Sequence, residues 1–128
     1  MKIEHVGLSV KEPHKMAEWY VKNLGFVIRR SAGNDQGGLA FISDPDQEAM
    51  LEIYNNNTTP PLDSFALPNL AIHIAFKSSD PDADLQRLIK AGATLIEHND
   101  PKPGGDTLFL LKDPWGNVLQ LAKRAKDF

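Results

Sequence analysis

Two histidines, a glutamate and a glutamine recur at one spacing along the chain. His5 and His73 are 68 residues apart (73 − 5), and Glu52 and Gln120 are also 68 residues apart (120 − 52). Imidazole nitrogens and carboxylate or amide oxygens suit divalent first-row ions such as Zn, Ni, Co, Mn or Fe. The chain has no cysteine, so a metal site would depend on ligands of these types. The four residues are therefore candidate ligands of one divalent ion.

The same spacing extends to residues with no metal chemistry, which indicates an internal duplication. The further pairs are Pro13 and Pro81, Gly25 and Gly92, and the dipeptides Asp44-Pro45 and Asp113-Pro114. We expect a first module over 1–54 and a second over 70–128. The segment 55–69 between them is polar, contains three prolines and is typical of a linker.

Each module is predicted to contain a strand, a helix and three further strands. In the first module, a strand at 4–10 precedes a helix that Pro13 opens and Gly25 closes. In the second, a strand at 70–77 precedes a helix that starts after Asp80. The remaining strands are expected at 26–30, 38–43 and 49–54, and at 93–97, 107–112 and 117–122. Gly37-Gly38 is interpreted as a hairpin turn. The predicted class is α+β, with two βαβββ modules.

The alternation of side chains along a strand separates the four candidate ligands from the aliphatic residues. In the segment 70–76, "LAIHIAF", His73 shares a face with small alanines, and the opposite face carries isoleucines and phenylalanine. His5, Glu52 and Gln120 occupy the equivalent face of their strands. A lone histidine in such a segment is more often a hydrogen-bonded core residue, and a solvated polar face is the general alternative. The fourfold recurrence favours metal ligands.

Composition excludes several functional classes. The 128 residues are 41% hydrophobic and 24% charged, with a net charge of −3, as in an ordinary globular domain. We therefore expect no nucleic-acid partner. No apolar run approaches about 18 residues, so no membrane partner is expected and a cytoplasmic location is the default.

Several segments together resemble the vicinal oxygen chelate superfamily, which includes glyoxalase I, extradiol dioxygenases, methylmalonyl-CoA epimerase, and bleomycin and fosfomycin resistance proteins. The resemblance rests on "HVGLSV", "EWYVKNLGF", "MLEIY", "LAIHIAF", the pair Gly104-Gly105 and "DPWGNVLQL". It implies that His5, Glu52, His73 and Gln120 hold the ion. It also implies a curved, cleft-like mixed sheet with helices on its outer face, and a homodimer, as in many short members.

The resemblance has departures that bear on mechanism. Gln120 stands where most metal-dependent members carry a glutamate, and an amide cannot accept a proton. Glu52 is therefore the candidate catalytic base. Ser9 stands where glyoxalase I usually carries a glutathione-binding arginine, whereas Asn56 matches an amide used for glutathione or is a linker asparagine. Lys102 could reach an anionic substrate or be a surface lysine. These three are the candidate substrate-binding residues.

Three functions follow from this pattern. The first is a glyoxalase-like lyase or isomerase that acts on a small substrate with vicinal oxygens through enolate stabilisation. The second is a non-catalytic small-molecule binder of the bleomycin resistance type. The third is an Fe(II) dioxygenase with His5, His73 and Glu52 as its iron ligands.

Overall fold

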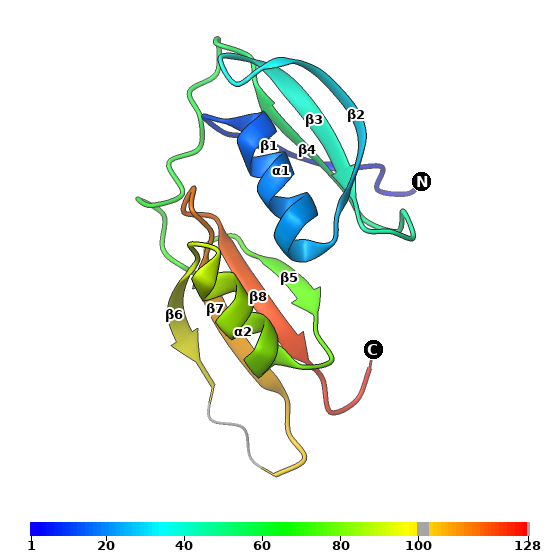
Figure 1. Cartoon of the computed structure of the whole chain (residues 1–128), viewed down its shortest axis with the longest axis vertical. Helices are drawn as coiled ribbons and strands as arrows, with labels where there is room; N and C mark the ends of the chain where they lie inside the picture. The colour runs from blue at the N-terminus through cyan, green and yellow to red at the C-terminus, as the bar shows by residue number, and fades with distance from the viewer. Residues whose placement is uncertain (100–102, 128) are drawn as a thin grey trace. The chain divides into compact units, whose positions relative to one another are not determined.

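The chain forms two compact units of the same construction. The computed structural model describes residues 1–99 and 103–127. The units are Met1–Leu62 and Asp63–Phe128, so the division falls inside the segment 55–69. Each contains a strand, a helix and three further strands (Figure 1). The α+β class with two βαβββ modules is confirmed.

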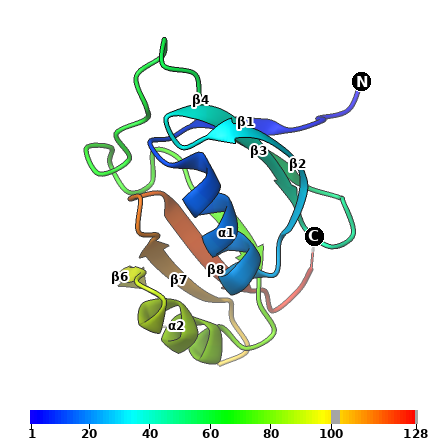
Figure 2. The ribbon, with the colours of Figure 1, turned by 45° about the horizontal axis from the view of Figure 1, so that its top comes forward.

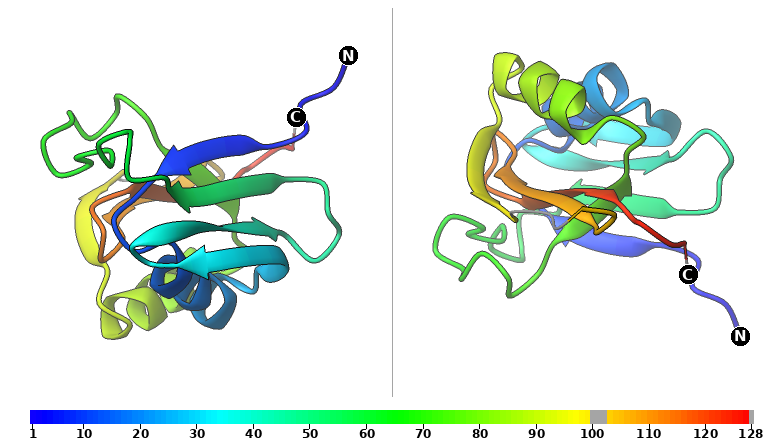
Figure 3. Two further views of the ribbon diagram at one scale, coloured as in Figure 1. Left: turned by 90° about the horizontal axis from the view of Figure 1, so that it is seen from above. Right: turned by 90° about the horizontal axis from the view of Figure 1, so that it is seen from below.

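The first unit is a four-stranded mixed sheet with one helix. Its elements are β1 (Val6–Ser9), α1 (Pro13–Leu24), β2 (Val27–Asn34), β3 (Gly37–Ser43) and β4 (Met50–Asn55). The strands lie in the order β1-β4-β3-β2, as the left view of Figure 3 shows. β1 runs parallel to β4, and the other pairs are antiparallel. This order places β4, which carries Glu52, between β1 and β3.

The second unit repeats this arrangement. Its elements are β5 (Ile74–Lys77), α2 (Pro81–Lys90), β6 (Thr94–His98), β7 (Thr107–Lys112) and β8 (Val118–Lys123). The strand order is β5-β8-β7-β6, with β5 parallel to β8. α2 contacts β6, β7 and β8 of its own sheet (Figure 2). In the described part of the chain, neither helix has the length and hydrophobicity that a membrane crossing needs.

Each unit has an aliphatic core between its helix and its sheet. In the first, Met16 and Tyr20 of α1 and Ile42 and Ile53 of the sheet are all fully buried. In the second, Leu88, Leu111 and Leu119 are fully buried. Burial of such side chains stabilises a fold by roughly 1.5–3 kcal/mol each, so the helix-facing side of each sheet holds the unit together. The opposite side is left for other roles.

The helix ends follow the sequence signals, except for one cap that comes from elsewhere. Gly25 closes α1 in the left-handed conformation (φ 74°), and the Asp80 carboxylate accepts the backbone N–H of Ala83 at the start of α2. At the start of α1, Asp35 of the β2–β3 turn takes the capping role. Its Oδ1 accepts the backbone N–H groups of His14 (2.8 Å) and Lys15 (3.4 Å).

Two sequence-based predictions about strand ends were wrong. The strand predicted at 70–77 begins only at Ile74, because the preceding backbone forms a turn in which the Ala71 N–H donates to the Pro68 carbonyl (2.9 Å). His73 therefore lies immediately before β5. Gly37 and Gly38 belong to β3 and pair with Asn34 and Gly33, so the hairpin turn is formed by residues 35–36.

Candidate functional site

Register places a row of residues from three strands on one face of the first sheet. Glu52 of β4 lies opposite Gly7 of β1 and opposite Phe41 of β3. Its chain neighbours Leu51 and Ile53 are buried, whereas Glu52 and Tyr54 are only half-buried. Residues paired in register point to the same face, so Glu52 lies on the face away from the aliphatic core, as the alternation predicted.

His5 lies at the end of this row and contacts it through both ring nitrogens and the ring itself. Its Nε2 atom is 3.4 Å from Oε2 of Glu52. Its Nδ1 atom is hydrogen-bonded to the Glu4 carboxylate, and its ring packs edge-on against Phe41 with centroids 5.4 Å apart. These three contacts fix the position of the imidazole beside the Glu52 carboxylate.

The same contacts change the protonation of His5. The hydrogen bond to Glu4 is the largest cause that raises the pKa of His5 above 6.5; burial opposes it, and the charges of Glu4 and Glu52 add to it. In the neutral ring, donation from Nδ1–H to Glu4 leaves the lone pair on Nε2. Hydrogen bonding of one ring nitrogen to a carboxylate is the usual way in which proteins orient a metal-binding histidine.

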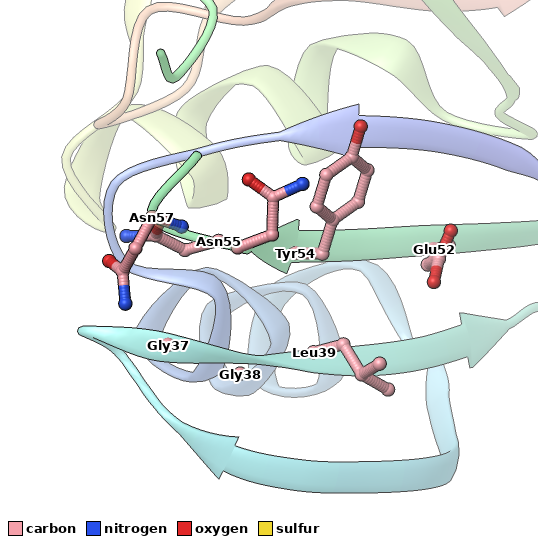
Figure 4. Close-up of a pocket in the computed structure, with 8 residues that line it drawn as sticks. Gly37, Gly38, Leu39, Glu52, Tyr54, Asn55 and Asn57 are labelled. Carbon is pink, nitrogen blue, oxygen red and sulfur yellow. The ribbon is translucent and has the colours of Figure 1, made fainter. Parts of the chain in front are cut away.

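A pocket of about 560 Å³ lies on this face of the first unit, lined by residues 37–39, 52 and 54–57. In Figure 4, Glu52 and Tyr54 stand beside each other on β4, Leu39 projects from the neighbouring β3, and Asn55 and Asn57 lie where β4 ends. Because Glu52 contacts both His5 and this pocket, a small molecule in the pocket would meet the carboxylate directly.

The second unit presents the equivalent row. Gln120 of β8 lies opposite Ala75 of β5 and Leu110 of β7. Gln120 is half-buried, and His73 is exposed just before β5. The structure therefore brings His5 and Glu52 together within the first unit. The grouping of that pair with His73 and Gln120 stays a prediction.

Within residues 1–99 and 103–127, no three His, Asp or Glu side chains form a group that could hold a metal ion. Since glutamine is outside that set, the first unit offers two donors, His5 and Glu52, and the second offers His73 and Gln120. A four-ligand site would need residues from both units.

The three candidate substrate-binding residues have different surroundings. Ser9 lies opposite Tyr54, and its Oγ atom is buried without a hydrogen-bond partner among the described residues. Asn56 lines the pocket, but its Oδ1 accepts the backbone N–H groups of Thr58 (3.1 Å) and Thr59 (2.8 Å). The Asn56 oxygen thus holds the turn after β4. Lys102 lies outside the described residues.

Sequence reasoning missed three residues of this site: Glu4, Phe41 and Tyr54. Tyr54 had a signal, since it follows Glu52 by two positions and must share its face. Phe41 contacts His5 only because β3 pairs with β4 in this register, which no local pattern reveals.

Comparison with known proteins identifies the family. The model of the Glyoxalase/Bleomycin resistance protein/Dioxygenase superfamily matches residues 2–121, which include both rows and all four candidate ligands. The chain belongs to this superfamily. No curated protein matches the chain closely enough to be called a relative. The superfamily assignment confirms the resemblance seen in the sequence and covers both βαβββ units.

Solved structures of the superfamily share the fold over nearly the whole chain. A glyoxalase family protein from Bacillus cereus is 20% identical with a TM-score of 0.81, covering 97% of this chain and 94% of that one. TnmS3, an antibiotic-binding protein from Streptomyces sp. CB03234, is 22% identical with a TM-score of 0.65, covering 97% and 98%.

A variant of the fosfomycin resistance protein FosX from Listeria monocytogenes, in complex with Mn(II) and a dihydroxypropylphosphonic acid, is 17% identical with a TM-score of 0.74, covering 99% and 91%. At these identities the likeness establishes the fold.

Proposed function

We propose that the protein is a metal-dependent lyase or isomerase that acts on a small substrate with vicinal oxygens. His5 and Glu52 of the first unit and His73 and Gln120 of the second would hold one divalent ion, of Zn, Ni, Co, Mn or Fe. The observation that carries the proposal is the approach of His5 Nε2 to Glu52 Oε2 at the equivalent positions of a duplicated fold. The superfamily match supports it.

The distance between these two atoms fits a shared ion. At 3.4 Å it exceeds the usual 2.7–3.2 Å of an N–H···O hydrogen bond. Two donor atoms, each about 2.1 Å from one tetrahedral ion, lie roughly 3.4 Å apart. The His5 lone pair on Nε2 and the Glu52 carboxylate are also of the chemical types that such an ion takes.

The chain's own residues would divide the chemistry. A divalent ion would stabilise the negative charge that develops on the substrate oxygens. The Glu52 carboxylate would remove the proton from the carbon next to the substrate carbonyl and return it to the adjacent carbon. Gln120 cannot take this role, because an amide does not accept a proton near neutral pH. Glu52 is therefore both ligand and base in this proposal.

The metal is tested first. Purified protein incubated with Ni, Co, Zn or Mn and then desalted should retain one equivalent of at least one ion by elemental analysis. His5→Ala and His73→Ala should each lose it, whereas His98→Ala, at an exposed position on β6, should retain it. Loss in all three variants, or in none, would contradict the ligand assignment.

The base is tested by proton exchange. Metal-loaded protein in D₂O should exchange the α-proton of at least one member of a panel of small α-hydroxycarbonyl compounds, followed by NMR. Glu52→Gln keeps an oxygen ligand but removes the base, so exchange should cease while some metal is retained. An active Glu52→Gln protein would exclude Glu52 as the base.

A homodimer is part of the proposal, and mixing two variants tests how its sites close. If each site combined the first unit of one protomer with the second unit of its partner, a mixed dimer of His5→Ala and His73→Ala chains would contain one intact site. Mixing the two inactive variants would then restore metal binding. No restoration would mean that each site closes within one chain.

The second candidate is a small-molecule binder without catalysis. It is favoured by Gln120, which removes a carboxylate from the ligand set, and by the amide-lined pocket. TnmS3, which shares the fold, is an antibiotic-binding protein. Protein that retains none of the four ions after incubation, yet binds a small molecule in this pocket, would establish this function over the enzymatic one.

A further inference from the structure

Gly7 opens a space between the Glu52 carboxylate and the Tyr54 ring. A Cβ atom built on Gly7 would lie 3.5 Å from Oε2 of Glu52 and 3.5 Å from Cε1 of Tyr54. Both side chains thus border the same point above β1, at van der Waals distance from it. A ligand held at Glu52 would extend directly past the edge of the Tyr54 ring.

The pocket beyond Glu52 carries no charge. Its remaining lining consists of the glycines Gly37 and Gly38, the side chains of Leu39 and Tyr54, and the amides of residues 55–57. An ionised group moved into such a wall would lose hydration without gaining an opposite charge, which costs several kcal/mol when it is fully desolvated. A neutral group with an apolar or aromatic body and hydrogen-bonding atoms meets partners of both kinds.

We propose that this part of the pocket is a ligand subsite that selects the uncharged portion of the substrate, with Tyr54 as its specificity-determining residue. The inference rests on the proposed function, because it assumes that the substrate's vicinal oxygens lie at Glu52. The substrate class is then a vicinal-oxygen compound with a neutral, preferably aromatic, substituent. A phosphonate or a carboxylate-bearing conjugate would be disfavoured here.

Leu39 and Tyr54 offer a way to reverse this selection. They are register partners on β3 and β4, so their side chains lie next to each other on the pocket face. Leu39 is half-buried at the pocket wall, where a lysine stem can lie along apolar surface and keep its ammonium group near solvent. Leu39→Lys would therefore add a cation to the subsite, and Leu39→Met matches its length without the charge.

The experiment uses three hydroxamates as bidentate oxygen probes of the metal-loaded protein, measured by calorimetry. Acetohydroxamate reports the metal alone, benzohydroxamate adds a neutral ring, and 4-carboxybenzohydroxamate adds a charged ring. We expect benzohydroxamate to bind about tenfold tighter than each of the other two, a difference of about 1.4 kcal/mol. Tyr54→Ala should remove this advantage and leave acetohydroxamate unchanged.

The Leu39 variants keep the test independent of the stability of Tyr54→Ala. Leu39→Lys should shift the preference toward 4-carboxybenzohydroxamate by about tenfold, and Leu39→Met should keep the wild-type order. Equal affinities of the two aromatic probes in wild-type protein, or no shift in Leu39→Lys, would overturn the subsite while acetohydroxamate binding upholds the metal centre. If acetohydroxamate itself fails to bind, the proposed function fails and the subsite with it.

Discussion

The Nε2 atom of His5 lies 3.4 Å from the Oε2 atom of Glu52, although the two residues are separated by most of the first unit. The contact exists because β1 runs parallel to β4 with Gly7 opposite Glu52, so the residue two positions before Gly7 reaches the same face. The imidazole is then held from its other side by Glu4.

Glu4 is expected to increase the affinity of the site for metal. Glu4→Gln removes the charged acceptor of the His5 Nδ1–H and should weaken binding of the retained ion by about tenfold, the lower end of the usual range for such partners, because Glu4 is exposed. The measurement is a competition titration against a coloured chelator. Glu18→Gln, at an exposed position of α1, is the control and should bind metal as wild type does. Equal affinities in the two variants would contradict the role of Glu4.

Asp35 is expected to stabilise the start of α1 from a distance. Asp35→Ala leaves the His14 and Lys15 N–H groups without their acceptor and should lower the free energy of unfolding by about 1 kcal/mol. Urea denaturation followed by circular dichroism measures it. Asp46→Ala removes the same charge at an exposed position of the β3–β4 connection and should cost much less. Similar losses would mean that charge alone, rather than the cap, matters.

Gly38 and Gly7 should respond differently to a single methyl group. A Cβ on Gly38 would lie 2.5 Å from the Ala32 carbonyl oxygen and 2.6 Å from backbone atoms of Asn34, so Gly38→Ala must displace the β2–β3 hairpin. We expect a loss of about 1–3 kcal/mol in unfolding free energy. Gly7→Ala meets its neighbours at 3.5 Å and should unfold at nearly the wild-type temperature. Thermal unfolding of the two variants makes the comparison; an equal effect would contradict the crowding at Gly38.

Asp84 should contribute stability that depends on pH. Burial raises its pKa, but hydrogen bonds from Ser78 (2.6 Å) and Arg87 (2.6 Å) outweigh burial and hold the pKa below 3.8. The charged form is thus favoured by folding, so its contribution is present above pH 3.8 and is lost as pH falls through the lowered pKa.

Asp84→Asn should therefore be less stable than wild type by about 1 kcal/mol at pH 7, and the difference should shrink below pH 4. Urea unfolding at a series of pH values measures it. Asp82→Asn, exposed in the same helical turn, is the control and should show a smaller difference at pH 7. A difference for Asp84→Asn that persists unchanged at low pH would rule out this cause.

Much of the fold was predictable because its signals are local. Pro13, Gly25 and Asp80 mark helix ends through their own backbone chemistry, and all three marks hold. The start of β5 was not, because hydrophobic alternation continues through Leu70 and Ile72 while the backbone turns, and both side chains are exposed. Nor could the Asp35 cap be found, since it joins positions about 20 residues apart through the docking of a hairpin.

The site was predictable to the extent that the duplication reveals it. The 68-residue spacing and strand alternation were enough to place Glu52 on the face away from the core and to pair it with His5. The supporting residues Phe41 and Glu4 carry no repeat signal. Their contacts with His5 depend on the register of β3 and on the path of the first residues before β1.

Every strand ladder described above joins strands of the same unit. During synthesis, the first unit therefore has all its pairing partners as soon as β4 has left the ribosome. It can bury its core before the second half exists, which keeps loop-closure entropy small and limits the exposure of unpaired strands to aggregation. A duplicated chain of this kind assembles in two short steps rather than one long one.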